Sequence, residues 1–406
     1  MSNSRPRIVY ACSCWPHDRA FGGQLRALHI GRALQEIGKV TLVVVSEETA
    51  APDVLERTAH EFAVEPQVRV NSHPNRGLIQ RLRWAFDPRF LNVHGCVADS
   101  QDRARLLDRL RDFDLVWVLN SRTPNILNQW SWPRSVLDVD DMPSAFAHTV
   151  WKNGAGLKEK FKAGVTMLLL SRRERLWKNR FSVLSVCSEP DRQHLGGGEH
   201  VHVIPNGFQR PAQEPLRNPI DPPRIGFIGL FSYSPNLEGM RWFVRECWPL
   251  VKREIPNARL RVAGKDSDGP LKPAGPDIDA LGFVADPAAE IATWSVMVVP
   301  VLHGAGTRVK IADAFSRKCP VVSTCLGAFG YEVQSGRELL MADDPDSFAA
   351  ACVALIRDRA SASAMAERAF AAFLEKWTWD AIAPRIQAAA EDALRQEHDQ
   401  RVKATP

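Results

Sequence analysis

The chain has 406 residues, of which 45% are hydrophobic and 24% are charged, and its formal net charge is +5. This length exceeds what one hydrophobic core usually supports, so we expect two domains, and the weak positive charge allows anionic ligands but does not indicate a nucleic acid. No apolar run reaches the roughly 18–20 residues of a membrane-spanning helix, and the N-terminus lacks the apolar core of a signal peptide, so we expect a cytoplasmic protein.

Strand and helix patterns alternate through the first half of the chain. The run at 40–45 is apolar without polar alternation, which is typical of a strand buried on both faces. Gly22 and Gly23 separate the first strand from the first helix. Strands separated by helices indicate a parallel, doubly wound sheet. The predicted elements are strands at 7–11, 40–45, 115–119, 135–139 and 183–187 and a helix at 24–37.

A segment rich in proline and polar residues, 208–223, interrupts this alternation and is predicted to be an extended linker. The alternation then restarts, with strands at 224–229, 259–264, 296–300 and 320–323 and helices at 235–254, 308–316, 346–357, 360–376 and 380–396. We therefore predict an α/β protein with two Rossmann-like domains, 1–207 and 224–377, that face each other across a ligand-binding cleft.

Glycines, cations and a predicted helix start come together after the third strand of the second domain. Gly304 and Gly306 allow the backbone to approach a ligand closely, and Thr307 is the predicted N-cap. A helix N-terminus after such glycines suits a phosphate. Arg308 and Lys310 fall in the first turn, where cations oppose the helix dipole unless an anion lies between them. The alternative is an ordinary strand-to-helix turn with two solvated charges.

Three carboxylates lie at the end of the predicted strand at 135–139 or directly after it, namely Asp138, Asp140 and Asp141. Carboxylates this close repel one another, so one of them should hold a proton more readily. Asp141, or with less support Asp138 or Asp140, is predicted to orient or deprotonate an acceptor hydroxyl. The alternative is an N-terminal helix cap. A single histidine is more often structural or solvated, so two of the histidines are weaker candidates. They are His17 and His303.

Short motifs occur in a fixed order along nearly the whole chain. They are Gly22-Gly23-Gln-Leu-Arg-Ala-Leu, Ser188-Glu-Pro-Asp191, Val203-Ile-Pro-Asn206-Gly207, Phe227-Ile-Gly229 with Ser234-Pro-Asn236, Val262-Ala-Gly264, Gly282-Phe-Val284, Gly306-Thr-Arg-Val-Lys310 with Asp313-Ala, Pro320-Val-Val-Ser-Thr324 with Gly327, and Trp377-Thr-Trp-Asp380. Together they resemble the retaining glycosyltransferases of family 4, whose fold is the two-domain glycosyltransferase-B (GT-B) fold. In that family the last helix, here 378–396, crosses back onto the first domain.

The resemblance implies transfer of a sugar from a nucleotide-sugar to a glycan or lipid-linked acceptor, with retention and with no metal or cofactor, as in bacterial polysaccharide or glycolipid synthesis. It assigns Arg308 and Lys310 to the donor diphosphate and Asp313 to the ribose hydroxyls, while Phe283 and Val284 would line the base. The implied donor-binding residues are Gly22, Gly23, Gly229, Asn236, Phe283, Val284, Gly304, Ala305, Gly306, Thr307 and Asp313.

Two departures leave the donor sugar open. Ala305 stands where the family often has a glutamate near the sugar, and the segment 230–233 lacks the basic residue that many members carry there. Two other functions therefore remain as alternatives. One is a sugar-nucleotide 2-epimerase of the same fold, and the other is a sugar-nucleotide-binding subunit without catalytic activity.

A basic stretch in the first domain, 151–180, contains nine Lys or Arg residues and two Glu residues among aromatic and aliphatic ones, and 76–90 is similar. This composition predicts peripheral contact with an anionic membrane at the cytoplasmic face. The alternative is solvated basic helices whose apolar side packs inward. The eight cysteines are scattered, so we expect reduced thiols and no metal site.

Overall fold

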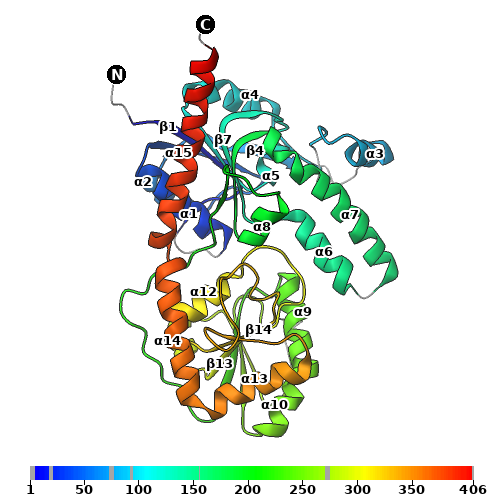
Figure 1. Ribbon diagram of the computed structural model, residues 1–406, viewed down its shortest axis with the longest axis vertical. Helices are drawn as coiled ribbons and strands as arrows, with labels where there is room; N and C mark the ends of the chain where they lie inside the picture. Colours follow the sequence, from blue (N-terminus) through cyan, green and yellow to red (C-terminus); the bar gives the residue numbers. More distant parts are fainter. Residues whose placement is uncertain are drawn as a thin grey trace. The chain divides into compact units, whose positions relative to one another are not determined.

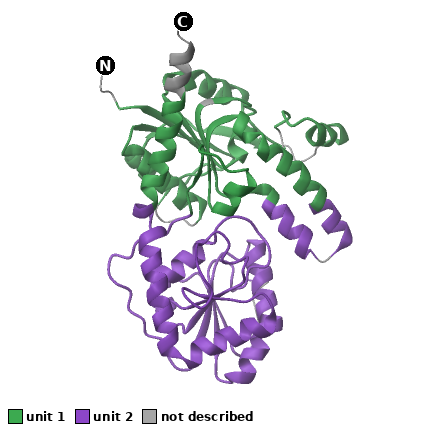
Figure 2. Cartoon of the chain, in the orientation of Figure 1, with its two compact units in different colours: residues 1–144, 164–205, 382–406 green, residues 145–163, 206–381 purple. Residues whose placement is uncertain are grey.

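The structure is a computed structural model that describes residues 5–17, 22–72, 77–91, 95–154, 156–269 and 275–404. It confirms an α/β fold with parallel sheets (Figure 1). The chain forms two compact units (Figure 2). Unit 1 comprises residues 1–144, 164–205 and 382–406, and unit 2 comprises 145–163 and 206–381. No helix in the described ranges is long and apolar enough to cross a membrane.

The sheet of unit 1 has the strand order β5-β4-β2-β1-β6-β7-β8-β9, with β3 paired to β2, and only the β4–β5 pair is antiparallel among the described strands. Its central strand β6 consists of five apolar residues that are all buried, because helices cover both faces of a doubly wound sheet. The strands are β1 Arg7–Cys12, β2 Lys39–Ser46, β3 Ala63–Val64, β4 Val68–Ser72, β5 Cys96–Ala98, β6 Leu115–Leu119, β7 Trp132–Val139, β8 Phe181–Val186 and β9 Val201–Val203.

The helices that accompany this sheet are α1 Gly23–Gln35, α2 Pro52–Glu61, α3 Leu78–Phe86, α4 Ser100–Arg109, α5 Arg122–Ile126, α6 Pro143–Asn153, α7 Leu157–Arg175, α8 Glu189–His194 and α15 Trp379–Ala404. Residues 382–406, which hold most of α15, group with unit 1. Asp392 of α15 lies 3.1 Å from His200 Nδ1 and 2.9 Å from His202 Nε2, so these polar contacts tie the helix to the edge strand β9.

The sheet of unit 2 has the order β12-β11-β10-β13-β14-β15, and all its pairs are parallel. Buried apolar side chains pack in two clusters, which contain Phe227 and Trp294 respectively. A Cβ on Gly226 would lie 2.0 Å from the Trp294 ring, so only glycine lets that indole pack over β10. The strands are β10 Arg224–Ile228, β11 Arg259–Ala263, β12 Ile278–Gly282, β13 Val296–Val299, β14 Val321–Ser323 and β15 Leu340–Met341.

The helices of unit 2 are α9 Ser234–Trp242, α10 Trp248–Glu254, α11 Pro287–Ala292, α12 Val309–Ser316, α13 Pro345–Arg357 and α14 Arg359–Lys376. A π-helical turn, Phe243–Cys247, separates α9 from α10, where the sequence predicts one continuous helix. Pro249 at the start of α10 explains the interruption, because its ring has no N–H and crowds the preceding turn.

Two segments differ from the predicted domain division. Residues 145–163, which include most of α6 and the start of α7, group with unit 2, so α7 carries both colours in Figure 2. The predicted linker 208–223 also groups with unit 2 and is fastened to it. The amide of Asn218 donates to the Ala292 carbonyl at 3.0 Å, and Arg217 donates to the Ile291 carbonyl at 2.6 Å. Prolines keep this segment extended, and the donors of Arg217 and Asn218 find acceptors at the end of α11.

Candidate functional site

The strand order of unit 2 reverses between β10 and β13. From β10 the chain moves outward to β11 and β12, and from β13 it moves in the other direction to β14 and β15. Open α/β sheets bind ligands outside the carboxyl ends of the strands at such a switch point. The residues that follow β10 and β13 therefore form the candidate site, and they include most of the predicted donor-binding residues.

The loop between β13 and α12 has a glycine-dependent shape. Gly304 and Gly306 have φ angles of 133° and 71°, in the left-handed region that favours glycine. The buried guanidinium of Arg308 folds back on this loop, where its Nη1 donates to the carbonyls of Ala305 and, at 2.9 Å, Gly306. A Cβ on Gly304 would lie 2.6 Å from Arg308 Nη2. Arg308, the first of the two predicted phosphate-binding cations, therefore donates its hydrogen bonds to carbonyls of its own loop.

The start of α12 leaves polar groups unsatisfied. The prediction that Thr307 is the N-cap is wrong, because Arg308 has extended φ and ψ of −88° and 98° and occupies that position without a side-chain capping bond. Thr307 Oγ1 is buried and has no hydrogen-bond partner among the described residues. The amides of Ala305, Gly306 and Thr307 donate no hydrogen bond within the described chain, whereas the Gly304 amide donates to Thr149 Oγ1 at 3.0 Å. Buried donors without acceptors at a helix N-terminus suit an anionic ligand.

Lys310 is the cation that faces this site. Its Nζ donates to Asn236 Oδ1 at 2.9 Å and lies 5.3 Å from the centre of the Phe227 ring. Among the described residues, no carboxylate lies within ion-pair distance of Lys310 Nζ. Burial, and next the charge of Arg308, lower the pKa of Lys310 to about 7, although Asp313 acts in the opposite direction. An anion that entered the site would restore the protonated form.

The remaining predicted donor residues of unit 2 lie around the same edge of its sheet. Asp313 is buried on α12 and accepts a hydrogen bond from Arg317 Nε at 2.5 Å, and burial raises its pKa despite that partner. Phe283 follows β12 and is 71% exposed, which makes its ring available for stacking. Val284 beside it is partly buried against the core, and Gly229 directly follows β10.

A pocket of about 800 Å³ adjoins this loop within unit 2. His303, a weaker candidate from the sequence, lines the pocket, and its Nδ1 lies 3.6 Å from Glu238 Oε2. The other lining residues are Phe146, Thr149, Val150, Lys152, Asn153, Gly154, Glu159, Ser234, Val301, Leu302, Thr324, Cys325, Leu326 and Asp343. The mixture of amide, hydroxyl and charged side chains suits a polar ligand.

The predicted acid–base residues lie in unit 1, at the carboxyl end of β7. Asp138 is fully buried in an ion pair with Arg26 of α1, with Nε–Oδ2 and Nη2–Oδ1 distances of 3.1 and 2.6 Å, and it also accepts from Ser185 Oγ at 2.5 Å. These partners occupy both carboxylate oxygens, so its candidacy as a catalytic base is wrong. Asp141 is exposed and Asp140 is partly buried, so both can still meet a substrate.

Arg26 has a structural role that the sequence interpretation missed. Besides the ion pair, its guanidinium donates to the carbonyls of Ile204 and Pro205 at 3.0 and 3.3 Å. It joins α1 to the segment where the chain leaves unit 1. The sequence signal that could have indicated this role is an arginine within the otherwise apolar stretch of α1. Gly22, with φ of 58°, and Gly23 are exposed at the start of the same helix.

Beside Asp141, a hydrogen-bonded cluster anchors the start of α6. Ser144 donates from its amide and its hydroxyl to the buried carboxylate of Glu174, at 2.7 and 2.5 Å. His194 Nε2 lies 3.0 Å from Glu174 and 3.2 Å from Ser144 Oγ, and its hydrogen bond with Glu174 raises the pKa of His194. One imidazole nitrogen meets both partners, so the group lacks the arrangement of a Ser–His–acid triad, in which each nitrogen has its own partner.

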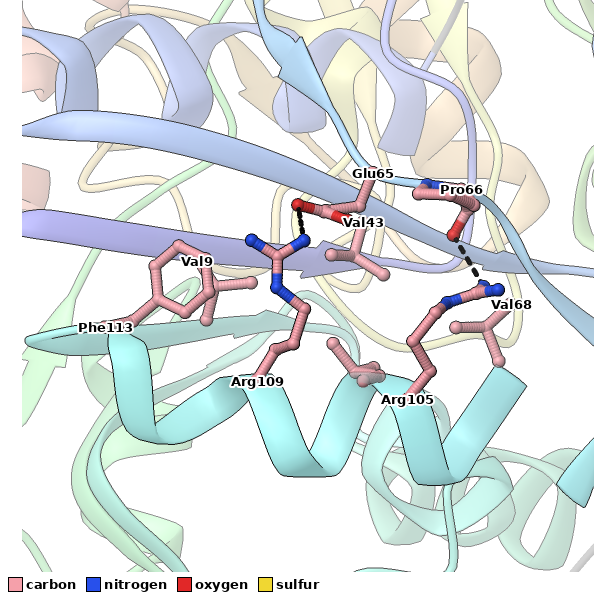
Figure 3. Close-up of a pocket in the computed structure, with 9 residues that line it drawn as sticks. Val9, Val43, Glu65, Pro66, Val68, Arg105, Arg109 and Phe113 are labelled. Atoms are coloured by element: carbon pink, nitrogen blue, oxygen red, sulfur yellow. Dashed lines mark hydrogen bonds and ion pairs between the residues drawn. The ribbon is translucent and has the colours of Figure 1, made fainter. Parts of the chain in front are cut away.

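Two cavities in unit 1 are smaller than the pocket beside the loop of unit 2. The one in Figure 3, between α4 and the sheet, has a volume of about 10 Å³, which is at the lower limit for one water molecule. Arg109 pairs with Glu65 across it, and Arg105 donates to the Pro66 carbonyl. His17 lines a separate pocket of about 170 Å³ against α1 and α2. No group of metal-ligating side chains occurs among the described residues.

Comparisons with known proteins identify the fold. Residues 222–358 match the family model "Glycosyl transferases group 1". A 44.6 kDa protein in the cps region of Klebsiella pneumoniae is 32% identical over 157 residues, which are 36% of this chain and 40% of that protein, so the match spans less than half of the relative.

Solved structures match the chain over nearly its full length. Sucrose-phosphate synthase from Thermosynechococcus elongatus has a TM-score of 0.67 at 15% identity and covers 98% of this chain and 100% of its own. Anabaena HepE, solved with UDP and glucose, has a TM-score of 0.60 at 15% identity and coverages of 95% and 99%. WaaG, a glycosyltransferase involved in lipopolysaccharide biosynthesis, has a TM-score of 0.60 at 14% identity and coverages of 94% and 98%. These similarities show that the fold is GT-B.

Proposed function

We propose that this chain, whose residues 222–358 form a glycosyl transferases group 1 domain, is a retaining glycosyltransferase of family 4 that transfers a sugar from a nucleotide-sugar. The observation that carries the proposal is Lys310, a cation held by Asn236 at the switch point of unit 2. Beside it, buried Thr307 Oγ1 and the loop amides lack acceptors among the described residues. Two phosphates would supply both the charge and the acceptors.

The chemistry follows from these groups. Charge develops on the diphosphate as the bond to the sugar breaks, and a fixed cation and amide donors stabilise that charge without reorganising. Lys310 and the amides of 305–307 would bind the diphosphate, while Arg308 keeps the loop in the binding conformation. In a retaining reaction without a protein nucleophile, the leaving phosphate takes the acceptor proton. Asp141 would orient the acceptor hydroxyl, and the reaction would need no metal.

The donor is proposed to be a UDP-sugar. Support comes from the similar HepE structures, whose complexes contain UDP or UDP-glucose. Phe283 and Val284 would line the base, and Asp313 would accept from the ribose hydroxyls. Gly22 and Gly23 of unit 1 are proposed as further donor contacts. Ala305 leaves the identity of the sugar open, because it offers no side-chain hydrogen bond.

The acceptor is proposed to be a glycan or a lipid-linked sugar in polysaccharide or glycolipid synthesis. The partial match to a protein from a cps region and the similarity to WaaG support this class. A lipid-linked acceptor would require contact with an anionic membrane at its cytoplasmic face.

Binding and transfer test the proposal separately. We expect UDP-sugars to raise the thermal unfolding temperature of the purified protein, since a ligand at about 100 times its Kd adds about 2.7 kcal/mol to stability. GDP- and ADP-sugars provide the comparison. Transfer to a lipid-linked acceptor should release UDP, continue in EDTA and retain the anomeric configuration in the NMR spectrum of the product. The proposal would be overturned if no nucleotide-sugar stabilised the protein, and an inverted product would refute the retaining mechanism.

A further inference from the structure

The pocket of about 800 Å³ in unit 2 has one wall from the first segment of that unit, residues 145–163. Two side chains of α6 in this segment are tied to the loop after β13. The Gly304 amide donates to Thr149 Oγ1 at 3.0 Å, and Asn153 Nδ2 donates to the Leu302 carbonyl at 2.5 Å. These bonds fix the wall against the loop, and the volume between them is within the range of small-molecule sites.

The pocket adjoins the proposed diphosphate site. His303 lines the pocket and directly precedes Gly304, the first glycine of the loop. The helix α9 contributes to both places, because Asn236 accepts from Lys310 Nζ at 2.9 Å and Glu238 lines the pocket two residues later. In a nucleotide-sugar the sugar is bonded to the outer phosphate. A donor whose diphosphate lies at Lys310 would therefore direct its sugar toward this pocket.

Carboxylates dominate the charged lining of the pocket. Three carboxylates line it, those of Glu159, Glu238 and Asp343, whereas Lys152 is the one lysine in the lining. His303 adds an imidazole, whose Nδ1 lies 3.6 Å from Glu238 Oε2. The lining is therefore negative whether His303 is neutral or protonated, in contrast to the cation and amide donors of the diphosphate site.

The carboxylates of the lining keep acceptor capacity for a ligand. Asp343 Oδ1 accepts from the Cys325 amide at 2.8 Å, and Glu238 Oε1 accepts from the Ser234 hydroxyl, but an ionised carboxylate offers about four lone-pair sites. The ring of Phe146, which is 40% exposed, adds an apolar surface to the same lining. An aromatic ring beside hydrogen-bond acceptors matches a sugar ring, which has C–H faces and hydroxyl edges.

We propose that this pocket holds the transferred sugar and selects it by charge, so that it accepts a sugar without an anionic group and rejects a uronic acid. The inference rests on the proposed function, because it needs a donor whose diphosphate lies at Lys310. A carboxylate on the sugar would lie among the acids of the lining, where like charges repel more strongly than in bulk water. Glu238 then supplies the sugar-side carboxylate that Ala305 cannot.

Matched pairs of donors test the selection. UDP-glucose and UDP-glucuronate differ only at C6, where the acid has a carboxylate in place of a hydroxymethyl group, and UDP-galactose and UDP-galacturonate form a second pair. With the full chain in isothermal titration calorimetry, we expect each acid to bind at least about tenfold more weakly than its neutral partner. UDP alone lacks the sugar, so its binding reports on the base and diphosphate sites independently of the pocket.

Variants that change charge but not shape identify the groups responsible. In Glu238→Gln/Asp343→Asn the amide oxygens can still accept from Ser234 and Cys325, so the double variant should reduce the discrimination to about threefold or less and leave the Kd for UDP unchanged. Lys152→Gln should increase the discrimination, because it removes a positive charge from the lining.

The matched control is Glu246→Gln, which removes a carboxylate of unit 2 that pairs with Arg245 at 2.6 Å and does not line the pocket. It should keep the discrimination of the unaltered chain. Equal or tighter binding of the acids in both pairs would overturn this inference and leave the proposed function standing, as would unchanged discrimination in Glu238→Gln/Asp343→Asn. Failure of UDP and of all four UDP-sugars to bind would overturn the proposed donor and this inference together.

Discussion

The Nζ atom of Lys310 donates a hydrogen bond to Asn236 Oδ1 at 2.9 Å. Lys310 lies on the helix after β13 and Asn236 on the helix after β10, so the bond spans the two strands of the switch point. The side-chain Nδ2 of Asn236 donates to the Leu230 carbonyl at 2.8 Å, which fixes the orientation of the side chain. A cation with a neutral partner is thus held in place at the position where this fold binds ligands.

Replacing Lys310 by glutamine should weaken donor binding. A hydrogen bond to a charged group contributes about 2 kcal/mol, so we expect the Kd for a UDP-sugar to rise roughly thirtyfold in isothermal titration calorimetry. The control is Lys376→Gln, which removes a lysine of the same unit that pairs with Glu332 at 2.9 Å. Equal affinity in Lys310→Gln and the unaltered chain would exclude Lys310 from the diphosphate site.

Donor binding should depend on pH through the same lysine. Its pKa is lowered to about 7 in the free protein, mainly by burial, and a bound diphosphate would raise it again. Protonated Lys310 binds better, so affinity should be constant below the free pKa and fall as the pH rises through it. The fall should be about tenfold per pH unit until the pKa of the complex is reached. Titrations from about pH 6 to about pH 9 measure this, and Lys310→Gln should remove the dependence.

The shape of the loop should depend on Gly304. An alanine there combines a strained φ of 133° with a Cβ 2.6 Å from Arg308 Nη2, so the guanidinium would have to leave the loop carbonyls. We expect Gly304→Ala to cost about 1–3 kcal/mol of unfolding free energy and to abolish donor stabilisation in a thermal shift assay. Gly336→Ala is the matched control, because Gly336 has a φ of 87° with open space around it. It should lose some stability but keep donor binding.

Neighbouring aspartates should respond in opposite ways to substitution. Asp138→Ala leaves Arg26 buried without its carboxylate, which should cost about 3–5 kcal/mol of unfolding free energy. Asp141→Asn alters an exposed side chain, so unfolding and donor binding should be unchanged while the rate of transfer to the acceptor falls. Chemical denaturation and a transfer assay distinguish the two, and normal turnover in Asp141→Asn would remove its proposed role.

The strands and the turn that form the backbone of the site could be predicted, because short stretches of sequence determine them. Apolar runs mark the strands, and Gly304 and Gly306 mark the sharp turn after β13. The directions of the side chains were not predictable in the same way. Arg308 is in a suitable place for a ligand, but its guanidinium turns back on the carbonyls of its own loop, which depends on the positive φ at Gly304.

Long-range partners account for the other differences. Asp138 and Asp141 look alike in sequence, and only the fold brings Arg26, which is 112 residues away, onto Asp138. The apolar residues of α7 at 157, 161, 165 and 168 illustrate the same limit. Their spacing predicts an amphipathic helix, for which an inward apolar side is the ordinary outcome, and the packing of the whole chain decides that Leu157 and Phe161 face solvent.

The return of α15 to unit 1 has a consequence for the order in which the protein can be completed during synthesis. Ile382, Ile386 and Ala390 are buried in unit 1 but are translated after the whole of unit 2. Unit 2 is complete in sequence at residue 381, so it can finish folding while unit 1 still lacks its last helix. A ribosome that stopped just after residue 381 would therefore release a chain with a complete unit 2 and an unfinished unit 1, although most of unit 1 is made first.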